Sequence, residues 1–310
     1  MQTAFAVPIR NKAKWGLEQC VRQVLAQSYS PMDIFFSDQG SEDDSLALVR
    51  KLVDGYNGPN RIYVLQCPDT DPVAMCGLNA HYNWLMNQID ADFIMWSSAD
   101  DFPVKERSAR TMTVMNEHDG ALSYIGTMQR NFGPDGKYKG DTARPDKTQI
   151  CDLAAIAEQR LGGSMSSAWR SDLWEKFGPL PAVGVQDLLV PFWAGLDRGM
   201  FYISEPLQIR THWDDPNQTG LQDIMESTTD LAYRKQMEEI THFQMCANHI
   251  YMAQAADKVA QQNPARYEEI ATVIDKLMHT VLGHTAGWVE TRTWLTERKI
   301  VPLCFQQRRN

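Results

Sequence analysis

The stretch Asp92-Phe93-Ile94-Met95-Trp96-Ser97-Ser98-Ala99-Asp100-Asp101-Phe102 decides how the fold is interpreted. Its four consecutive apolar residues, 93–96, predict a short buried strand. Asp100 and Asp101 follow that strand, and aspartate is unfavourable within strands and costly to bury without a partner. Ligands of open α/β sheets bind at the carboxyl ends of strands, so the two carboxylates there predict a bound cation. Taken alone, the pair also fits a turn with two solvated aspartates.

Strand and helix patterns alternate on both sides of this stretch. Apolar runs predict strands at 4–8, 34–36, 61–65, 93–96 and 201–203. Helical spacing predicts helices at 15–27, 77–88, 107–117, 154–160, 169–176 and 188–196. One more helix is predicted to begin after 40, with Ser41 as its N-cap. Short strands are expected around the turn signal at 133–136. This alternation predicts an α/β fold with a mostly parallel sheet and right-handed crossovers.

The length and composition allow one large domain with an extension, or two domains. The chain has 310 residues, of which 43% are hydrophobic and 22% charged, which is ordinary globular usage. After about residue 220 the sequence becomes polar with a helical period, and it predicts helices at 221–262, 264–282 and 286–298. We therefore expect an α/β domain at 1–220 and an α-helical C-terminal extension at 221–310.

Charge and cysteine usage exclude several classes of protein. The net charge of −9 excludes a global basic field for nucleic acid. A local basic and aromatic patch near the C-terminus could bind a nucleic acid, and it fits a solvated helical surface equally well. The patch comprises Trp288, Arg292, Trp294, Arg298, Lys299, Arg308 and Arg309. The six cysteines show neither C-x-x-C nor zinc-ligand spacing. Reduced thiols are then expected, as in a cytoplasmic protein.

Signals for export, for membrane insertion and for two common nucleotide sites are missing from the sequence. Residues 1–8 lack the basic region and long apolar run of a signal peptide, and no run of 18 apolar residues occurs. A cytoplasmic location is therefore expected. The G-x-G-x-x-G and G-x-x-x-x-G-K-[ST] fingerprints are also missing. The sheet must hold its ligand by other means.

Six short motifs, in this order, resemble those of inverting family-2 nucleotide-sugar glycosyltransferases, which have the GT-A fold. They are Val7-Pro8-Ile9-Arg10-Asn11-Lys12, Val24-Leu25-Ala26-Gln27-Ser28-Tyr29, Asp38-Gln39-Gly40-Ser41-Glu42-Asp43, Gly77 with Asn83, Ser98-Ala99-Asp100-Asp101, and Gln186-Asp187. The resemblance implies a Rossmann-like, mostly parallel sheet flanked by helices. It divides 1–220 into a nucleotide-binding half, 1–103, and an acceptor-binding half, 104–220. It ends near residue 215 and leaves the helical extension unexplained.

The resemblance also implies a reaction, namely transfer of a sugar from a nucleotide sugar to a hydroxyl acceptor. A UDP-linked sugar is the expected donor. Mg²⁺ or Mn²⁺ would stabilise the leaving diphosphate, with Asp101 in direct contact with the metal and Asp100 binding metal or ribose. His212 falls where relatives carry a histidine near the diphosphate or metal. The residues implied in nucleotide binding are Pro8, Arg10, Asn11, Asp38, Asn83 and Asp100.

Asp187 is the carboxylate implied as the general base that deprotonates the acceptor hydroxyl. Its alternative role is a first-turn aspartate that stabilises a helix by about 1 kcal/mol. Asp38, which could accept the imide N–H of a uracil, is alternatively an ordinary turn residue. His212, as a lone histidine, is alternatively structural.

The chain departs from the family pattern at Gln39, Ser98 and Gln186, each of which stands where relatives carry a carboxylate. These substitutions motivate a second hypothesis, a catalytically inactive module that binds nucleotide or glycan. A third is a glycosyltransferase whose acceptor is a hydroxylated nucleic-acid base. Motifs of this kind do not define the donor sugar, the acceptor or the oligomeric state.

Overall fold

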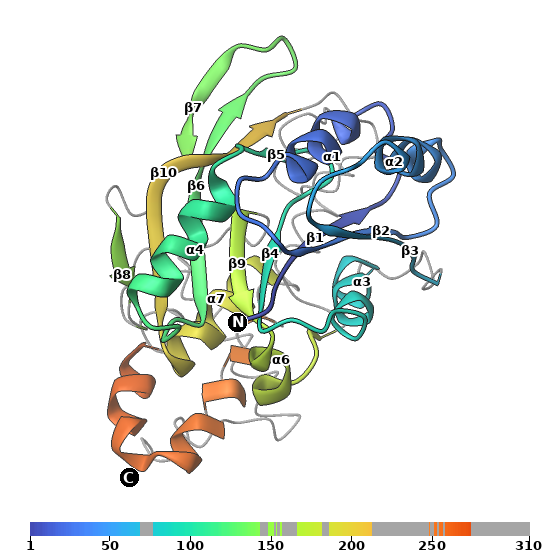
Figure 1. Ribbon diagram of the computed structural model, residues 1–310. Coiled ribbons are helices and arrows are strands. Elements are labelled where there is room, and N and C mark those ends of the chain that lie inside the picture. The colour runs from blue at the N-terminus through green and yellow to red at the C-terminus, as the bar shows by residue number, and fades with distance from the viewer. Residues whose placement is uncertain are drawn as a thin grey trace, which may run out of the picture.

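A computed structural model of the protein describes residues 1–68, 77–142, 148–151, 153, 156, 166–181, 186–212, 248, 251–252, 254–256 and 258–273 (Figure 1). The predicted helix at 286–298, the basic patch near the C-terminus and the predicted domain boundary at residue 220 lie outside these residues. So do most of the predicted helices at 154–160 and 221–262. Within the described residues, no helix is both long and apolar enough to cross a membrane.

The strands form one mixed sheet, which confirms the predicted α/β class (Figure 1). They are β1 (Thr3–Ile9), β2 (Asp33–Asp38), β3 (Arg61–Gln66), β4 (Phe93–Trp96), β5 (Phe102–Pro103), β6 (Tyr124–Phe132), β7 (Tyr138–Thr142), β8 (Gln149–Cys151), β9 (Ser167–Arg170) and β10 (Met200–Thr211). Their order is β3-β2-β1-β4-β9-β6-β10-β5, with β7 on β6 and β8 on β10. The first four strands are mutually parallel, and β9 is antiparallel to both of its neighbours.

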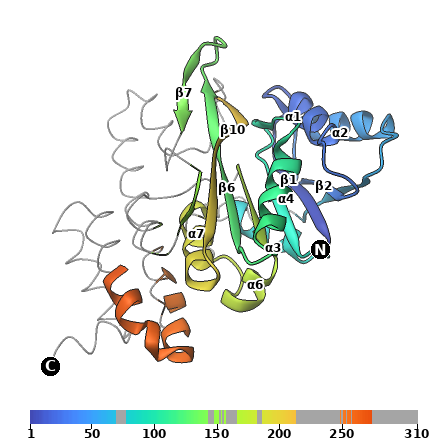
Figure 2. The ribbon, with the colours of Figure 1, turned by 60° about the vertical axis from the view of Figure 1, so that its left-hand side comes forward.

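Helices cover both faces of this sheet. They are α1 (Leu17–Leu25), α2 (Ser45–Asp54), α3 (Gly77–Met86), α4 (Arg107–Glu117), α6 (Asp172–Phe177) and α7 (Gln186–Asp197). A short 3₁₀ helix, η2 (Pro264–Arg266), interrupts the C-terminal helical residues. Seen along the sheet, α4 and α7 lie on opposite sides of β6 and β10 (Figure 2).

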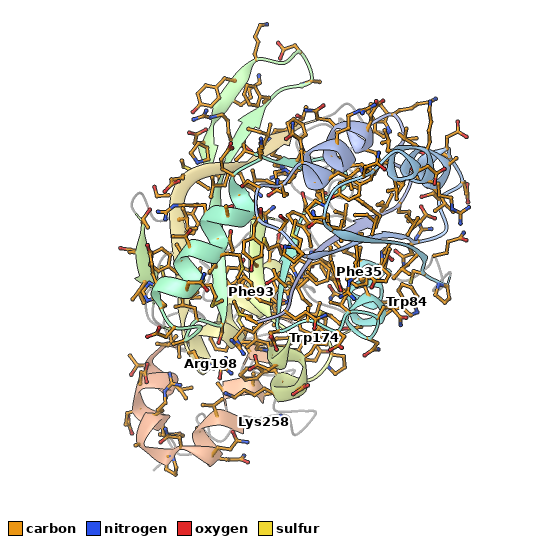
Figure 3. All side chains as sticks on the ribbon, in the orientation of Figure 1. Phe35, Trp84, Phe93, Trp174, Arg198 and Lys258 are labelled. Carbon is orange, nitrogen blue, oxygen red and sulfur yellow. The ribbon has the colours of Figure 1, made fainter. Side chains whose placement is uncertain are left out.

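Alternation along the strands builds a separate core on each face. In β1, Phe5 and Val7 pack toward α1, α2 and α4, whereas Ala4 and Ala6 pack toward α3 and its neighbours. Phe93 belongs to the first of these cores and Phe35 to the second; both are labelled in Figure 3. The period-two alternation of a strand buried on both faces thus holds the sheet between two apolar layers.

Two local predictions were wrong, and a third was correct but too short. Trp169 and Arg170 belong to strand β9 rather than to a helix starting at 169, because Trp169 pairs with Ile94 and stacks on Trp96 at 4.9 Å between ring centroids. The predicted N-cap Ser41 does not start α2, which begins at Ser45 after Asp44. The strand predicted at 201–203 extends over 200–211, because β10 continues through a register shift around Pro206 to pair with β5.

The described part of the predicted extension packs against α6 and α7. Met252, Ala256 and Ile270 join the same core as α7. Arg266 Nη1 donates a hydrogen bond of 2.6 Å to the carbonyl of Leu196, and Lys258 Nζ bonds the carbonyl of Lys176. Figure 3 shows Lys258 beside α6. These helical residues therefore pack on the face of the sheet that α1 does not cover.

Candidate active site

The candidate site lies at the carboxyl ends of β1, β2 and β4. In the parallel register Ile9 pairs with Asp38 and Ala6 with Trp96, and the N–H of Ser97 donates to the carbonyl of Ala6. The loops that follow these strands consequently leave the sheet at one edge. Asp38 and the loop with Asp100 thus lie at one edge, as expected for carboxyl ends of parallel strands, and ligands of open α/β sheets bind at that edge.

Asp100 is held in the loop after β4 by two neighbours. Lys12 Nζ lies 2.8 Å from Asp100 Oδ2, and the hydroxyl of Ser98 donates to Asp100 Oδ1. Ser98, which replaces a carboxylate of the family pattern, thus orients the carboxylate that remains. The side chains of Lys12 and Asp100 are 16% and 23% exposed, so a ligand can still reach the pair.

Asp101 is buried beside Asp100. The backbone N–H of Thr211, at the end of β10, donates to Asp101 Oδ1 at 3.3 Å. Burial and the neighbouring charge of Asp100 raise the pKa of Asp101 well above its usual range, against the opposing effects of Arg210, the Thr211 N–H and Lys12. Two adjacent carboxylates, one of them buried, favour an additional cation at this point.

The oxygen chemistry of this pair suits Mg²⁺ or Mn²⁺, which proteins often hold with one or two carboxylates while phosphate oxygens and water complete the shell. Among the described residues, no group of three or more His, Cys, Asp or Glu side chains is placed to hold a metal together. Asp100 and Asp101 therefore fit as two ligands of a site that a bound diphosphate completes. Their metal role stays a prediction.

His212 directly follows the end of β10, and its N–H donates to the carbonyl of Phe132 at 2.9 Å. Its neighbour Thr211 contacts Asp101, so the chain brings His212 close to the carboxylate pair. The structure does not join His212 with both aspartates into a three-residue group. A contact with metal or diphosphate remains a prediction for this histidine.

The loops after β1 and β2 are bonded to each other. Asn11 has a left-handed φ of 52°, its N–H donates to Ser41 Oγ at 2.9 Å, and its Oδ1 accepts from the N–H of Glu42 at 2.8 Å. The carboxylate of Asp38 accepts the N–H of Ser41 at 3.0 Å. These contacts match the turn role of Asp38, and the nucleotide-binding roles of Asp38 and Asn11 stay predictions.

His81 is a residue of this edge that the sequence analysis missed. It lies on α3 and is 1% exposed, and its Nε2 is 2.7 Å from the hydroxyl of Ser37, which stands opposite Pro8 in the sheet. Burial, with a smaller effect of Arg10, lowers the pKa of His81 to about 4. His81 is therefore neutral at pH 7 and lies within electrostatic reach of Arg10. Its position between Gly77 and Asn83 was the available signal.

Asn83 bonds the protein itself rather than facing the edge as a free amide. Its Nδ2 donates to the carbonyl of Leu180 at 2.8 Å, and its Oδ1 accepts from the N–H of Leu180 at 2.8 Å and from Trp174 Nε1 at 3.1 Å. The amide thus joins α3 to the segment after α6. This placement does not support the nucleotide contact predicted for Asn83.

Asp187 lies in the first turn of α7, the position that its alternative, helix-stabilising role predicted. The side chain is neither fully buried nor fully exposed. Burial raises the pKa of Tyr124, on β6, and the charge of Asp187 raises it further, against a hydrogen bond with Ser167. The carboxylate of Asp187 therefore acts electrostatically on Tyr124 of β6. Both its base role and its helix-capping role stay open to test.

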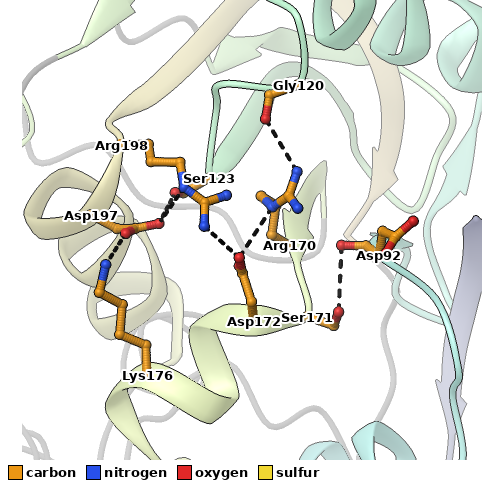
Figure 4. Close-up of polar contacts among 9 residues, drawn as sticks. All are labelled: Asp92, Gly120, Ser123, Arg170, Ser171, Asp172, Lys176, Asp197 and Arg198. Carbon is orange, nitrogen blue, oxygen red and sulfur yellow. Dashed lines mark hydrogen bonds and ion pairs between the residues drawn. The ribbon is translucent and has the colours of Figure 1, made fainter. Parts of the chain in front are cut away.

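A charged network occupies the opposite end of β4 and excludes Arg170 from the candidate site. Arg170 pairs with Phe93, at the amino end of β4, and its Nη1 donates to the carbonyl of Gly120 at 3.1 Å (Figure 4). Asp172 accepts from Arg170 and Arg198, and Asp197 accepts from Ser123 and Lys176. This network joins β9, α6 and α7.

The sheet order and the acidic edge define a nucleotide-binding α/β protein of the GT-A type. The family model for glycosyl transferase family 2 matches residues 5–175, so the chain belongs to that family. It is an enzyme that transfers a sugar from a nucleotide-sugar donor. No curated protein matches the chain.

Solved structures share the fold. S. aureus TarS 1–349 in complex with UDP-GlcNAc superposes with a TM-score of 0.56 at 15% identity, covering 92% of this chain and 93% of that one. The mannosyltransferase PcManGT of Pyrobaculum calidifontis, in complex with GDP-Man and Mn²⁺, gives 0.51 at 15% identity and covers 96% and 84%. At these identities the likeness establishes the fold alone.

Proposed function

We propose that this protein is a metal-dependent, inverting glycosyltransferase that moves a sugar from a UDP-linked donor to a hydroxyl acceptor. The adjacency of Asp100 and Asp101 at the carboxyl edge of β4 carries the proposal, because it places two oxygen ligands where a nucleoside diphosphate would bind. The UDP-GlcNAc complex of S. aureus TarS and the GDP-Man and Mn²⁺ complex of PcManGT support a nucleotide sugar and a divalent cation.

The chain's own residues have distinct parts in this reaction. Mg²⁺ or Mn²⁺ held by Asp100 and Asp101 would neutralise negative charge that develops on the leaving diphosphate. Lys12, beside Asp100, adds a positive charge to the same region. Asp187 accepts the proton of the acceptor hydroxyl as the hydroxyl oxygen attacks the anomeric carbon from the side opposite the diphosphate. That displacement inverts the configuration of the sugar.

Release of nucleoside diphosphate from a panel of nucleotide sugars, with Mn²⁺ or Mg²⁺, tests the proposal. Asp101→Asn keeps the shape of the side chain and removes its charge, so turnover should fall by about 100-fold or more. The matched control is Asp54→Asn, at the exposed end of α2. Turnover that survives both Asp101→Asn and removal of divalent cations with a chelator would rule out the mechanism.

The inactive nucleotide- or glycan-binding module, which membership of the family disfavours, is the alternative outcome of these experiments. Calorimetry separates the two candidates. Binding of UDP to the wild-type protein, together with failure of every donor to be transferred or hydrolysed, would favour the module. Release of UDP in any donor reaction would exclude it.

A further inference from the structure

Arg107, the first residue of α4, carries a buried cation directly beneath the acidic loop. The residue is 1% exposed. Its Nη1 donates to Gln208 Oε1 at 2.6 Å, and its Nη2 donates to the carbonyls of Trp96 at 2.6 Å and Ser167 at 3.0 Å. Among the described residues, no acceptor reaches its Nε. The acceptors that it does contact are neutral oxygens, so a positive charge is buried here without an ion pair among them.

These contacts lead into the loop that carries Asp100 and Asp101. Trp96 is the last residue of β4, so Arg107 fixes the point at which the loop begins. Gln208, on β10, accepts from Arg107 and donates from Nε2 to Ser97 Oγ at 2.9 Å, and Ser97 Oγ in turn donates to the carbonyl of Ser98 at 3.2 Å. The chain of hydrogen bonds therefore runs from α4 to Ser98, two residues before Asp100.

The surroundings argue against a role in packing alone. A buried charge without a counter-ion costs several kcal/mol, and an apolar side chain of similar size is often at least as stable in its place. The guanidinium also packs 5.5 Å from the ring centroid of Phe5, which would suit an apolar side chain equally well. Burial lowers the pKa of Arg107 to about 9, so the side chain remains charged at pH 7. A feature this costly points to a function at the loop that it holds.

The buried thiol of Cys20 lies between the Arg107 site and the loop that carries the two aspartates. Burial raises the pKa of the Cys20 thiol, the charges of Asp100 and Asp101 raise it further, and Arg107 acts in the opposite direction. Cys20 Sγ donates to the carbonyl of Ser98 at 3.3 Å. Arg107 and both aspartates therefore each act electrostatically on the Cys20 thiol, which is bonded to the backbone of loop 97–101.

We propose that Arg107 is a positioning residue of the donor site, which holds loop 97–101 through Trp96 and through Gln208 and Ser97 so that Asp100 and Asp101 meet the diphosphate of the donor. The inference rests on the proposed function for the identity of that ligand. Arg107 does not touch the donor. It acts through the backbone of β4 and through Gln208.

Two variants and a matched control test the inference. Arg107→Met removes the whole set of bonds, and Gln208→Met cuts only the branch to Ser97. Arg110→Met is the control, because Arg110 lies on the same helix and also bonds β10, with its Nε 2.9 Å from Glu205 Oε1, but at the partly exposed surface. Each variant is compared with wild type in thermal unfolding, in the calorimetric Kd for UDP with and without Mn²⁺, and in the KM for the donor.

Arg107→Met and Gln208→Met should each raise the Kd for UDP and the donor KM by about tenfold or more, since small misplacements of binding groups are costly. The double variant should be little worse than Arg107→Met, because both changes cut one path. Arg110→Met should leave both constants unchanged. Unchanged constants in the folded Gln208→Met and Arg107→Met proteins, or an equal rise in Arg110→Met, would overturn the inference.

Hydrogen exchange in the ligand-free protein provides a readout that needs no donor. The peptide spanning 96–103 should exchange faster in Arg107→Met and Gln208→Met than in wild type and Arg110→Met. Unchanged protection of that peptide would overturn the positioning role even if the wild-type protein released no nucleoside diphosphate. Failure of the inference is thereby distinguished from failure of the proposed function. If Arg107→Met does not fold, Gln208→Met decides by the same criteria.

Discussion

An ion pair joins Lys12, in the loop after β1, to Asp100, in the loop after β4: Lys12 Nζ lies 2.8 Å from Asp100 Oδ2. The two residues are 88 positions apart in the sequence, and they meet because β1 and β4 are parallel neighbours that end at one edge. Lys12 thus supplies a positive charge at the carboxylate that is predicted to share a divalent cation.

Lys12→Met should strengthen the binding of Mn²⁺ and weaken the binding of the nucleotide sugar. Removal of a positive charge beside Asp100 should lower the Mn²⁺ concentration needed for half-maximal activity, because like charges no longer repel. The KM for the nucleotide sugar should rise about threefold to tenfold, since the donor diphosphate loses a nearby cation. Steady-state kinetics over a matrix of Mn²⁺ and donor concentrations measures both constants.

Lys14→Met is the control for this prediction, because Lys14 lies two positions further along the same loop with an exposed side chain. It should change neither constant appreciably. A higher Mn²⁺ requirement in Lys12→Met would contradict the proposed competition at Asp100.

Asn83→Ala should destabilise the protein without affecting the donor. The change removes three hydrogen bonds, to both backbone groups of Leu180 and to Trp174, and should lower the free energy of unfolding by about 2–3 kcal/mol. Urea unfolding measures the loss, and donor KM at a temperature where both proteins are folded should agree within about twofold.

Asn87→Ala is the comparison for Asn83→Ala, since Asn87 follows the same helix and has an exposed side chain. It should cost less than about 0.5 kcal/mol. A rise in donor KM confined to Asn83→Ala, with little loss of stability, would restore the nucleotide-binding role that the family motif implied.

The outcome for Asn83 shows what the sequence could and could not predict. Periodicity identified the parallel strands, and parallel strands place their carboxyl ends together, so the common edge of Asp38 and Asp100 was predictable. Which groups an amide bonds depends on segments brought together from afar, such as Leu180 on Asn83. Periodicity contains no such information.

Strand β9 and Arg107 escaped prediction for the same physical reason. Four residues, Ser167–Arg170, are too few for a period to identify, and they form a strand because β4 and β6 bond them on both sides. Arg107 stands in an ordinary amphipathic helix, where arginine is usually exposed. Only the convergence of β4, β9 and β10 on its guanidinium reveals its position.

His81 should make the protein less stable as the pH falls from 6.5 to 4. Burial lowers the pKa of His81 from 6.5 to about 4, so the unfolded chain binds a proton in this window before the folded protein does. The stability that is fully present above pH 6.5 is lost through this interval. The full loss is about 3 kcal/mol, at 1.36 kcal/mol for each pH unit.

His81→Gln retains a group that can bond Ser37 but does not titrate, so its unfolding free energy should vary less between pH 7 and pH 4.5. Urea unfolding of both proteins at the two pH values measures the difference. Parallel losses of stability in wild type and His81→Gln would assign the acid sensitivity to other groups.

Asp187→Asn distinguishes catalysis from helix capping at the start of α7. If Asp187 accepts the acceptor's proton, the amide should lower kcat by about 10²–10⁴-fold, since a general base typically contributes that much, and leave the Kd for UDP unchanged. If Asp187 only stabilises the first turn, the unfolding free energy should fall by about 1 kcal/mol or less with kcat retained. Asp172→Asn serves as comparison, because Asp172 stands in the first turn of α6 and pairs with Arg170 and Arg198 at the far end of β4. That variant should lose stability but keep kcat, and an equal fall in kcat for both variants would show that disturbed helices, rather than a missing base, slow the reaction.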